Sequence, residues 1–510
     1  MMLFPIRYQL AWTRWTQAGA LVLAGTLVAG CGAGYRPVIS PINPTGPPAQ
    51  PNSLVAVVSA PSPTTAGIAT IIDYSGDTIV AQSPIGPGPL AFTIDETGSN
   101  GYTVNSDGTL TNFPVASSLQ QKQVQYTTLP TSAQTLNMFS PSTGLWISDL
   151  NGNVTDVLNG IPATFKLAVP VAPTPLMVIG PTVIAQRNYV IAENITDPTG
   201  MACNVSPRTV GSAGEADAIE LATYTVSARI PLGKCPVYGL ETPDNQRVFV
   251  LNRGDDTITV INSKNNILDA CTPFLNQSGQ LVTCHPSLPL STSAGLTGAN
   301  VPAIAGSVYA EYNVATSQLV VADYDGGTIS VIDVSLDQYG NDSATFGTTF
   351  TIPVGNTATP NPTAVTVLYD GSRAYTANQN DDPTGNGTGS GTVSIVNLSS
   401  HTLEKTVAVT GHPRTVASTQ NSLYGKVYAA APDSPYLSII RTDQDIIDTT
   451  VLTEGNVVDV RVTTQNGSTG NPNVTSRRPG YGEPCYLSAQ QLTAAGFSPP
   501  TLAQCQLQTP

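Results

Sequence analysis

The stretch LVVADYDGGTISVIDV, residues 319–334, decides the fold. Two runs rich in β-branched residues flank Asp-Tyr-Asp-Gly-Gly, a pattern typical of two antiparallel strands joined by a tight turn. A single hairpin cannot bury its apolar faces and is only marginally stable in water. Other parts of the chain must therefore supply sheets that cover it.

The same hairpin pattern recurs along the chain. Strong copies occupy 247–263, 373–399 and 426–442, and weaker copies occupy 54–76, 101–115, 144–158 and, broken by an insertion, 188–226. Each hairpin is followed by a third apolar run and, after a turn containing Gly or Pro, by a fourth. The hairpins start near residues 54, 101, 145, 188, 247, 318, 373 and 426. This spacing gives units of about 53 residues, the period and strand count of propeller blades.

The repeat predicts an all-β fold, a β-propeller of eight four-stranded blades, with seven blades as the alternative if one weak unit is not separate. Packing blades face to face around a ring buries both faces of each sheet. The first unit lacks its lead strand, because 54–60 matches the second strand of later units. A strand of the lead type, 456–464, follows the last unit. We expect it to pair beside 54–60 and close the ring.

The repeat resembles the YVTN-type β-propeller repeat. The pattern Tyr-Val-x-Asn, then Gly-Thr-Val-Ser-Val-Ile-Asp, then Ile-Pro-Val-Gly-x-x-Pro is matched well over 247–442 and more loosely over 54–196. That family includes surface-layer and envelope proteins of bacteria and archaea, so the resemblance implies a propeller in the cell envelope. Its motif residues fix turns and strand packing, and they imply no catalytic residue.

The first 31 residues resemble a bacterial lipoprotein signal. Arg7 and Arg14 precede the short apolar run 19–30, which ends in Val-Ala-Gly before Cys31. This predicts a signal peptide over 1–30 and lipidation of Cys31; the alternatives are an ordinary secretory signal and an uncleaved anchor. Residues 31–52, rich in Pro and Gly, are expected to form an extended linker. By the sorting rule of such lipoproteins, the Gly that follows Cys31 favours an outer membrane, on its periplasmic or exposed side.

The composition argues against nucleic-acid binding. Only 11% of the 510 residues are charged, and the formal net charge is −14. Removal of residues 1–30 takes away two arginines and no acidic residue, which brings the charge to −16. No cluster of Lys or Arg is present to contact phosphates. We therefore expect contact with a membrane through the lipid anchor, and an envelope protein or a glycan as partner.

Six cysteines remain beyond Cys31, and an even number in an exported chain predicts disulfides. Because sequence neighbours share an insertion or the tail, we favour the pairs Cys203–Cys235, Cys271–Cys284 and Cys485–Cys505. Their spacings fit no zinc motif. The propeller is expected over 53–465. Residues 466–510 are expected to form a tail stapled by the last pair, with one short helix over 487–497, or else a disordered tail.

The sequence carries no motif that assigns catalysis: it lacks HExxH, CxxCH, GxSxG and a phosphate loop. We interpret His285, His401 and His412 as loop or turn residues, the last at an end of the channel where propellers often bind ligands. The oxygen-rich loops at Asp323/Asp325 and 378–382 are interpreted as turns that need Asx residues, with a calcium site as the alternative.

The favoured function is a lipid-anchored, non-enzymatic module that binds or scaffolds a component of the cell envelope. No catalytic, cofactor-binding or metal-binding residue is assigned. One alternative is a propeller enzyme, such as a lactonase-like hydrolase or a quinone-cofactor dehydrogenase, which would need acids, His or Arg converging on the channel. The other is a structural surface-layer component.

Overall fold

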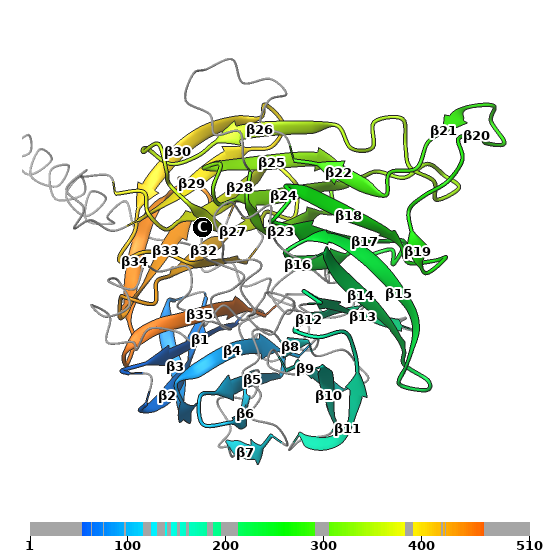
Figure 1. Cartoon of the computed structure of the whole chain (residues 1–510). Helices are drawn as coiled ribbons and strands as arrows, with labels where there is room; N and C mark the ends of the chain where they lie inside the picture. The colour runs from blue at the N-terminus through cyan, green and yellow to red at the C-terminus, as the bar shows by residue number, and fades with distance from the viewer. Residues whose placement is uncertain are drawn as a thin grey trace, which may run out of the picture. The chain divides into compact units, whose positions relative to one another are not determined.

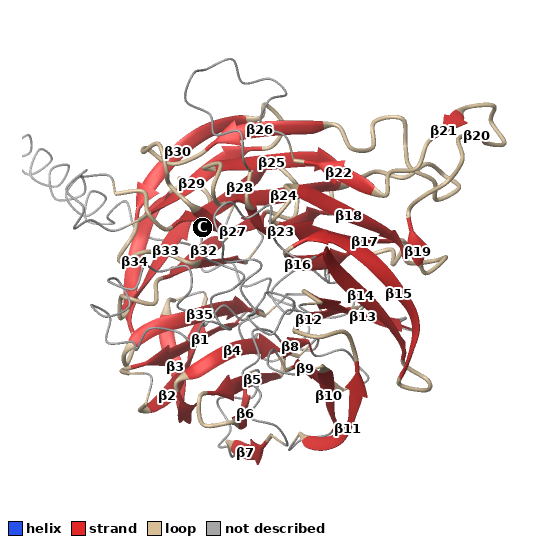
Figure 2. Cartoon of the chain, viewed as in Figure 1, coloured by secondary structure: helices blue, strands red, loops and turns tan. Residues whose placement is uncertain are grey.

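The computed structural model describes residues 54–463, apart from gaps at 63, 75, 96–97, 116–123, 130–137, 140–143, 150–152, 160–162, 181–186, 195–212, 291–304, 383–390, 420–421 and 424. All described residues belong to one unit of the chain, Gln50–Pro510. The regular structure in these ranges is entirely β (Figure 2), and they contain no helix suited to crossing a membrane. The predicted signal peptide, linker and tail lie outside the described residues.

Eight antiparallel sheets of four strands follow one another around a ring, so the chain is an eight-bladed β-propeller (Figure 1). Blade 1 consists of β35 (Asn456–Val462), β1 (Leu54–Ala60), β2 (Ala66–Asp73) and β3 (Thr78–Pro87). Blade 2 consists of β4 (Pro89–Ile94), β5 (Asn100–Asn105), β6 (Thr109–Pro114) and β7 (Gln125–Thr128). Blade 3 consists of β8 (Met138–Phe139), β9 (Leu145–Ser148), β10 (Val154–Asn159) and β11 (Thr164–Pro170). Blade 4 consists of β12 (Pro175–Ile179), β13 (Arg187–Ala192), β14 (Ala213–Glu220) and β15 (Thr225–Lys234).

The other four blades repeat this order from the inner strand outward. Blade 5 consists of β16 (Pro236–Glu241), β17 (Arg247–Asn252), β18 (Thr257–Asn262) and β19 (Ile267–Leu268). Blade 6 consists of β23 (Ser307–Asn313), β24 (Gln318–Asp323), β25 (Thr328–Asp333) and β26 (Thr349–Pro353). Blade 7 consists of β27 (Pro362–Val367), β28 (Arg373–Asn378), β29 (Thr392–Asn397) and β30 (Thr402–Ala408). Blade 8 consists of β31 (Thr415–Ser418), β32 (Lys426–Ala430), β33 (Tyr436–Arg441) and β34 (Ile446–Leu452).

The ring closes as the sequence predicts. Strand β35 pairs antiparallel with β1, with Val460 opposite Val57 and Val462 opposite Val55. All seven residues of β1 are buried. Without β35, β1 would present an unpaired edge, which is a template for aggregation. The last described strand therefore completes the first blade.

The hairpin that decided the fold is β24–β25, in which Asp323 lies opposite Thr328. Both faces of this hairpin are covered, since successive residues from Leu319 to Ala322 are all 0% exposed. Each fully buried large aliphatic side chain contributes about 1.5–3 kcal/mol relative to exposure. Stacking of neighbouring blades thus explains how strands with β-branched residues on both faces become stable.

The inner strands of five blades begin with the same backbone conformation. The residue before the strand has a positive φ between 48° and 58°, and a β-bulge follows within the first residues of the strand; these residues are Gly88, Thr174, Cys235, Gly306 and Asn361. Bulges of this kind redirect side chains and are common beside functional sites. The start of each inner strand therefore has a fixed geometry that repeats around the ring.

A recurring hydrogen bond, the latch, joins blades 2, 5 and 7 each to the blade before it. In blade 7 the hydroxyl of Ser394 accepts the N–H of Gly355, which arrives from blade 6, at 2.9 Å. The amide of Asn378 donates to the same hydroxyl at 2.8 Å. Blade 2 repeats both bonds, with the hydroxyl of Thr111 and the amide of Asn105. Blade 5 does so with the hydroxyl of Thr259 and the amide of Asn252. The Asn of the repeat motif therefore orients the latch rather than a ligand.

The outermost strand of blade 5 is split, a feature that the sequence did not predict. Strand β19 pairs with one end of β18, and β22 (Ser287–Pro289) pairs with the other. Between them the chain makes a small hairpin, β20 (Phe274–Leu275) and β21 (Leu281–Val282). Elements of two or three residues leave no periodic signal, so pattern reading misses them.

The cysteine prediction is confirmed for one pair. Cys271 and Cys284 form a disulfide that closes the β20–β21 hairpin. Cys235 is also disulfide-bonded. Its predicted partner Cys203 lies outside the described residues, as do Cys31, Cys485 and Cys505, so the pairs Cys203–Cys235 and Cys485–Cys505 stay predictions.

Candidate functional site on the top face

We call the end of the ring at which inner strands begin the top face, and the opposite end the bottom face. Second strands end at the top face, as the pairs Pro236 with Asn252 and Pro362 with Asn378 show. Immediately after the second strand, four consecutive blades place a buried polar residue. In each, its N–H donates to the carbonyl just before the inner strand. These residues, the polar arc, are Glu193, Arg253, Tyr324 and Gln379 of blades 4 to 7.

The cation of the polar arc is neutralised within the protein. Arg253, which is 2% exposed, donates to both carboxylate oxygens of Asp325, at 3.3 and 3.2 Å. Its guanidinium lies 5.3 Å from the ring centroid of Tyr324. Burial raises the pKa of Tyr324 to about 12, so its phenol stays protonated. Arg253 and Tyr324, together with Asp325, therefore form a rigid contact between blades 5 and 6.

The two ends of the polar arc differ from its middle. Both carboxylate oxygens of Glu193 and both polar atoms of the Gln379 side chain are buried without a hydrogen bond among the described residues. Burial raises the pKa of Glu193 to about 8, so the carboxyl is mostly protonated at neutral pH and can donate a hydrogen bond. An unpaired buried polar group costs about 1–3 kcal/mol, and native structures contain few. These two side chains are the strongest indication of a site.

A histidine pair adds to the top face in blade 8. His412, in the loop before β31, approaches Asp433 with 2.5 Å between Nδ1 and Oδ2, and its own N–H donates to Oδ1 at 2.8 Å. The hydrogen bond to Asp433 raises the pKa of His412 and outweighs the opposing effect of burial. The sequence placed His412 at this end of the channel as a turn residue. The structure confirms the loop and adds the Asp433 partner.

The remaining candidates from the sequence have structural roles. Asp323 accepts hydrogen bonds from Ser307 and Ser330, at 2.5 and 2.6 Å, inside blade 6. Asp381 accepts the N–H groups of Asn356 and Thr357, both at 2.7 Å. These bonds favour the turn interpretation of the oxygen-rich loops over calcium. Within the described ranges no group of three or more His, Cys, Asp or Glu could hold a metal ion.

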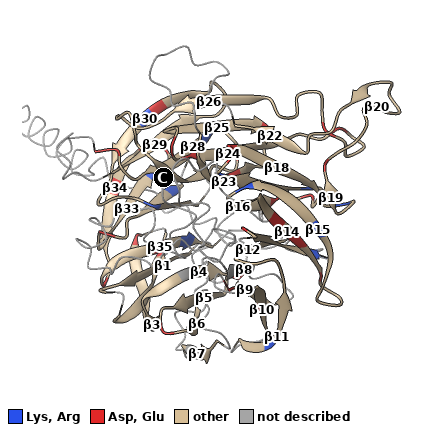
Figure 3. Ribbon diagram, viewed as in Figure 1, with Lys and Arg blue, Asp and Glu red and all other residues tan. Residues whose placement is uncertain are grey.

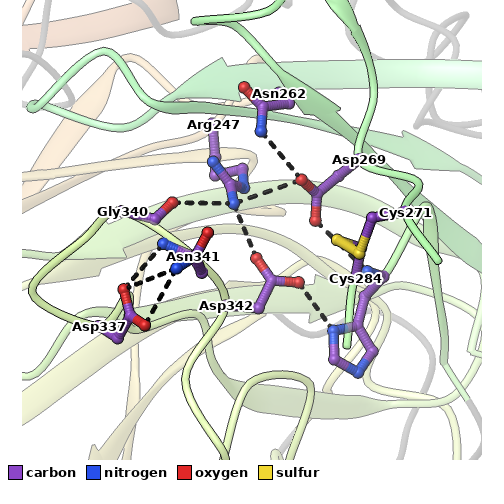
Figure 4. Close-up of a disulfide and its surroundings, with 10 residues drawn as sticks. Arg247, Asn262, Asp269, Cys271, Cys284, Asp337, Gly340, Asn341 and Asp342 are labelled. Atoms are coloured by element: carbon purple, nitrogen blue, oxygen red, sulfur yellow. Dashed lines mark hydrogen bonds and ion pairs between the residues drawn. A yellow bond between two sulfur atoms is a disulfide. The ribbon is translucent and has the colours of Figure 1, made fainter. Parts of the chain in front are cut away.

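A second polar cluster lies at the bottom face between blades 5 and 6 (Figure 4). The guanidinium of Arg247 contacts Asp342 at 2.9 Å and Asp269 at 3.3 Å. Nδ1 of His285 lies 2.8 Å from the other oxygen of Asp342. Burial, followed by the neighbouring Asp269, raises the pKa of Asp342 to about 6. Asp269 and His285 each lie close in sequence to a cysteine of the Cys271–Cys284 disulfide, so this cluster fixes the base of the hairpin.

His401, the third histidine, has a positive φ of 55° and stacks on Phe350 with ring centroids 3.8 Å apart. It lies between β29 and β30, as the sequence predicts. The polar arc, by contrast, was missed. Its members occupy equivalent positions only when the ends of the second strands are aligned. Arg253 and Gln379 each directly follow the motif Asn, and this position is the signal that could have revealed them. Glu193 follows Ala192 instead and carries no such marker.

Comparisons with known proteins identify the fold only. No protein-family model matches the chain, and no curated protein matches its sequence. Among solved structures it resembles AztD from Citrobacter koseri (TM-score 0.52, 10% identity, 80% of this chain and 97% of that chain). It also resembles the dihydro-heme d1 dehydrogenase NirN in complex with DHE (TM-score 0.56, 13% identity, 83% and 77% of the two chains). At such identities these likenesses support a shared propeller architecture.

Proposed function

We propose that the protein is a non-enzymatic binding or scaffolding module of the cell envelope, anchored by lipid on Cys31, and that its top face binds the ligand. The observation that carries the binding role is the polar arc, above all Glu193 and Gln379. The protein leaves these two side chains buried without hydrogen-bond partners among the described residues, at a cost in stability. A ligand that supplies an acceptor for the Glu193 carboxyl and partners for the Gln379 amide would relieve that cost.

The ligand of such a site is polar and uncharged at the point of contact. The Glu193 carboxyl is protonated at neutral pH and Gln379 carries an amide; both side chains are 0% exposed, so neighbouring groups must move aside before a ligand can contact them. The charge of Arg253 is already balanced by Asp325. A glycan hydroxyl or a peptide amide supplies both donors and acceptors, and this matches the envelope glycan or protein expected from the sequence.

Capture from solubilised envelope tests this proposal. The mature protein should retain a partner that Glu193→Ala and Gln379→Ala variants lose, and the purified partner should rebind at a fixed stoichiometry. Lys264→Ala, in the exposed turn that follows β18 at the bottom face, is the control and should behave as the parent. Equal capture by all four proteins would contradict a top-face site.

The lipid anchor has its own test. Cys31→Ser should leave an unlipidated precursor that incorporates no labelled fatty acid. Normal incorporation by this variant would contradict lipidation of Cys31.

A propeller enzyme is the second candidate, and the His412–Asp433 pair is the observation that favours it. A carboxylate that orients an imidazole is a common arrangement for a general base. Hydrolysis of a simple lactone, or quinone-dependent substrate oxidation, that disappears in His412→Ala would support this candidate. Ordered self-assembly of the purified protein would instead favour the third candidate, a structural surface-layer component.

A further inference from the structure

The hairpin β20–β21 stands away from the ring (Figure 1) and carries exposed apolar side chains. Leu275 and Leu281 lie opposite one another and are 68% and 65% exposed, and Phe274 is 42% exposed. Tyr339, in the loop between β25 and β26 of blade 6, is 40% exposed and lies beside the hairpin turn, with its hydroxyl 3.3 Å from that of Ser278. We call these four residues the apolar tip.

The hairpin that carries three of these four residues contains no charged residue, although the carboxylate of Asp337 lies against its turn. Residues 270–284 contain no Asp, Glu, Lys, Arg or His, in a chain that is otherwise acidic (Figure 3). A charged side chain in contact with acyl chains is costly, whereas Phe, Leu and Tyr suit the boundary between headgroups and acyl chains. Uncharged residues with apolar side chains at the end of a projection match the chemistry of a lipid surface.

The hairpin is held rigidly at its base and its turn. Cys271–Cys284 closes the base, and the Arg247–Asp342–His285 contacts join it to blade 6. At the turn, Asn276 donates to Asp337 at 3.3 Å. A rigid projection loses little conformational entropy when its tip is buried, which strengthens binding.

The position of the hairpin base agrees with a membrane on the same side. Arg247 begins a second strand at the bottom face, opposite Asn262. Leu54, the first described residue, begins the equivalent strand of blade 1, opposite Asp73. The chain therefore enters the propeller at the bottom face, where the hairpin is rooted, and the polar arc lies at the other end.

We propose that the apolar tip is a second membrane contact, which inserts into the headgroup and acyl-chain boundary of the bilayer that holds the lipid anchor. This inference rests on the proposed anchorage through Cys31. It orients the bottom face toward the membrane and leaves the top face, beneath which the polar arc is buried, on the side away from the membrane.

Tryptophan fluorescence in vesicles tests the contact. The mature, lipidated Leu281→Trp protein is reconstituted into phosphatidylethanolamine and phosphatidylcholine vesicles, with and without brominated phospholipid. Trp146, the one native Trp beyond residue 31, is 0% exposed and serves as a common background. Leu452→Trp is the matched control, because Leu452 is 58% exposed and ends β34 at the top face. Brominated lipid should quench the added emission of Leu281→Trp by roughly half and leave that of Leu452→Trp unchanged.

Equal quenching of the two variants would overturn the membrane contact. A blue shift of Leu281→Trp without quenching would also overturn it, because the added Trp would then be buried against protein and not in lipid. As a second measurement, substitution of Phe274, Leu275 and Leu281 by Ser should speed transfer of the intact protein between vesicles by at least roughly tenfold, while Leu452→Ser should not. Unchanged transfer would also overturn it. The mass of the peptide that begins at Cys31 distinguishes failure of the proposed lipid anchor from failure of the proposed hairpin contact. An unmodified cysteine defeats the anchor, whereas a lipidated protein with an unquenched tip defeats only the hairpin contact.

Discussion

Blades 7 and 4 make the same inter-blade latch with different chemistry. In blade 7 the latch is Ser394, oriented by Asn378, and the following arc residue is Gln379. In blade 4, Ala192 replaces the Asn, and Asp217 accepts the N–H of Ala172 at 2.6 Å. The arc residue there is Glu193, so neutral groups in one blade correspond to carboxyl groups in the other.

The difference gives the latch and arc of blade 4 an acid–base behaviour that those of blade 7 lack. Burial raises the pKa of Asp217 to about 6 and that of Glu193 to about 8. Asn378 and Gln379 cannot titrate, so the latch and arc residues of blade 7 contribute no comparable pH dependence. The latch and arc of blade 7 therefore keep the same charge at any moderate pH, whereas those of blade 4 carry groups whose protonation state matters for stability and for a ligand.

The largest expected effect concerns the ring that both blades share. Deletion from residue 456 onward removes β35 and exposes the edge of β1, so cooperative unfolding should be lost and aggregation should appear. Thermal unfolding and size-exclusion chromatography check this. Deletion from residue 464 onward retains β35 and should leave a cooperative monomer. A shorter variant as stable as the parent would show that the blades do not need closure.

Exchanging the arc residues between the two blades tests the comparison directly. Because the folded-state pKa of Glu193 is raised above its usual 4.5, its contribution to stability is full below about pH 4 and is lost as pH rises through about 8. Glu193→Gln should therefore raise the free energy of unfolding by up to about 4 kcal/mol at pH 8, and change it little at pH 4.

Gln379→Glu is the reciprocal change and should lower stability at pH 8 while leaving it nearly unchanged at pH 4. Urea unfolding at the two pH values measures both variants. If Glu193→Gln stabilises the protein and also fails to capture a partner, Glu193 lowers stability in order to bind, as functional residues often do. Identical pH profiles for both variants and the parent would show that the arc residues do not cause a difference in pH dependence between blades 4 and 7.

Asp323 is a carboxylate within the regular blades and takes the position of the motif Asn. Burial raises its pKa to about 6 despite hydrogen bonds from three hydroxyls, so its stabilising effect is lost as pH rises from about 4 through 6. Asp323→Asn gives blade 6 the chemistry of blade 7. It should stabilise the protein by up to about 3 kcal/mol at pH 8 and by less at pH 4. Destabilisation at pH 8 would mean that the hydroxyls of Ser307 and Ser330 require a carboxylate.

Removal of the neutral latch should have a smaller effect that does not depend on pH. Ser394→Ala leaves the N–H of Gly355 and one N–H of the Asn378 amide without their acceptor, while the bond from Asn378 to Thr392 remains, so the cost should be about 1–2 kcal/mol. Urea midpoints at pH 5 and pH 8 should fall equally. A loss confined to one pH would show that a titrating group contributes to the latch of blade 7 as well.

Reduction should affect the blades least. The Cys271–Cys284 bridge lies outside the blade strands, so far-UV circular dichroism should change little while protease cleavage within 271–284 increases. The denatured, unreduced mature protein should show no titratable thiol. Complete unfolding on reduction would show that the insertion of blade 5 supports the ring.

The fold was predictable where residues repeat. Alternating runs and Asx-Gly turns mark each second and third strand, and the register of 54–60 against 456–464 predicted closure. The split outer strand of blade 5 was not predictable, because β19 and β22 are too short for a periodic signal. The site was less predictable still. His412 and Asp433 come from different loops of blade 8, and Glu193 gains its meaning only from burial and from the alignment of blades in space.

Ring closure also determines how the protein responds to mechanical force. The N–H of Thr463 donates to the carbonyl of Leu54 at 2.9 Å, so the chain enters and leaves the propeller at one point. Tension between these two ends would act across the β1–β35 pair from that point and peel its hydrogen bonds apart one after another, rather than shearing them together. A tether on one side alone leaves the pair unstressed. The seam that completes the ring is therefore strong when the protein is held from one end and weak when it is pulled from both.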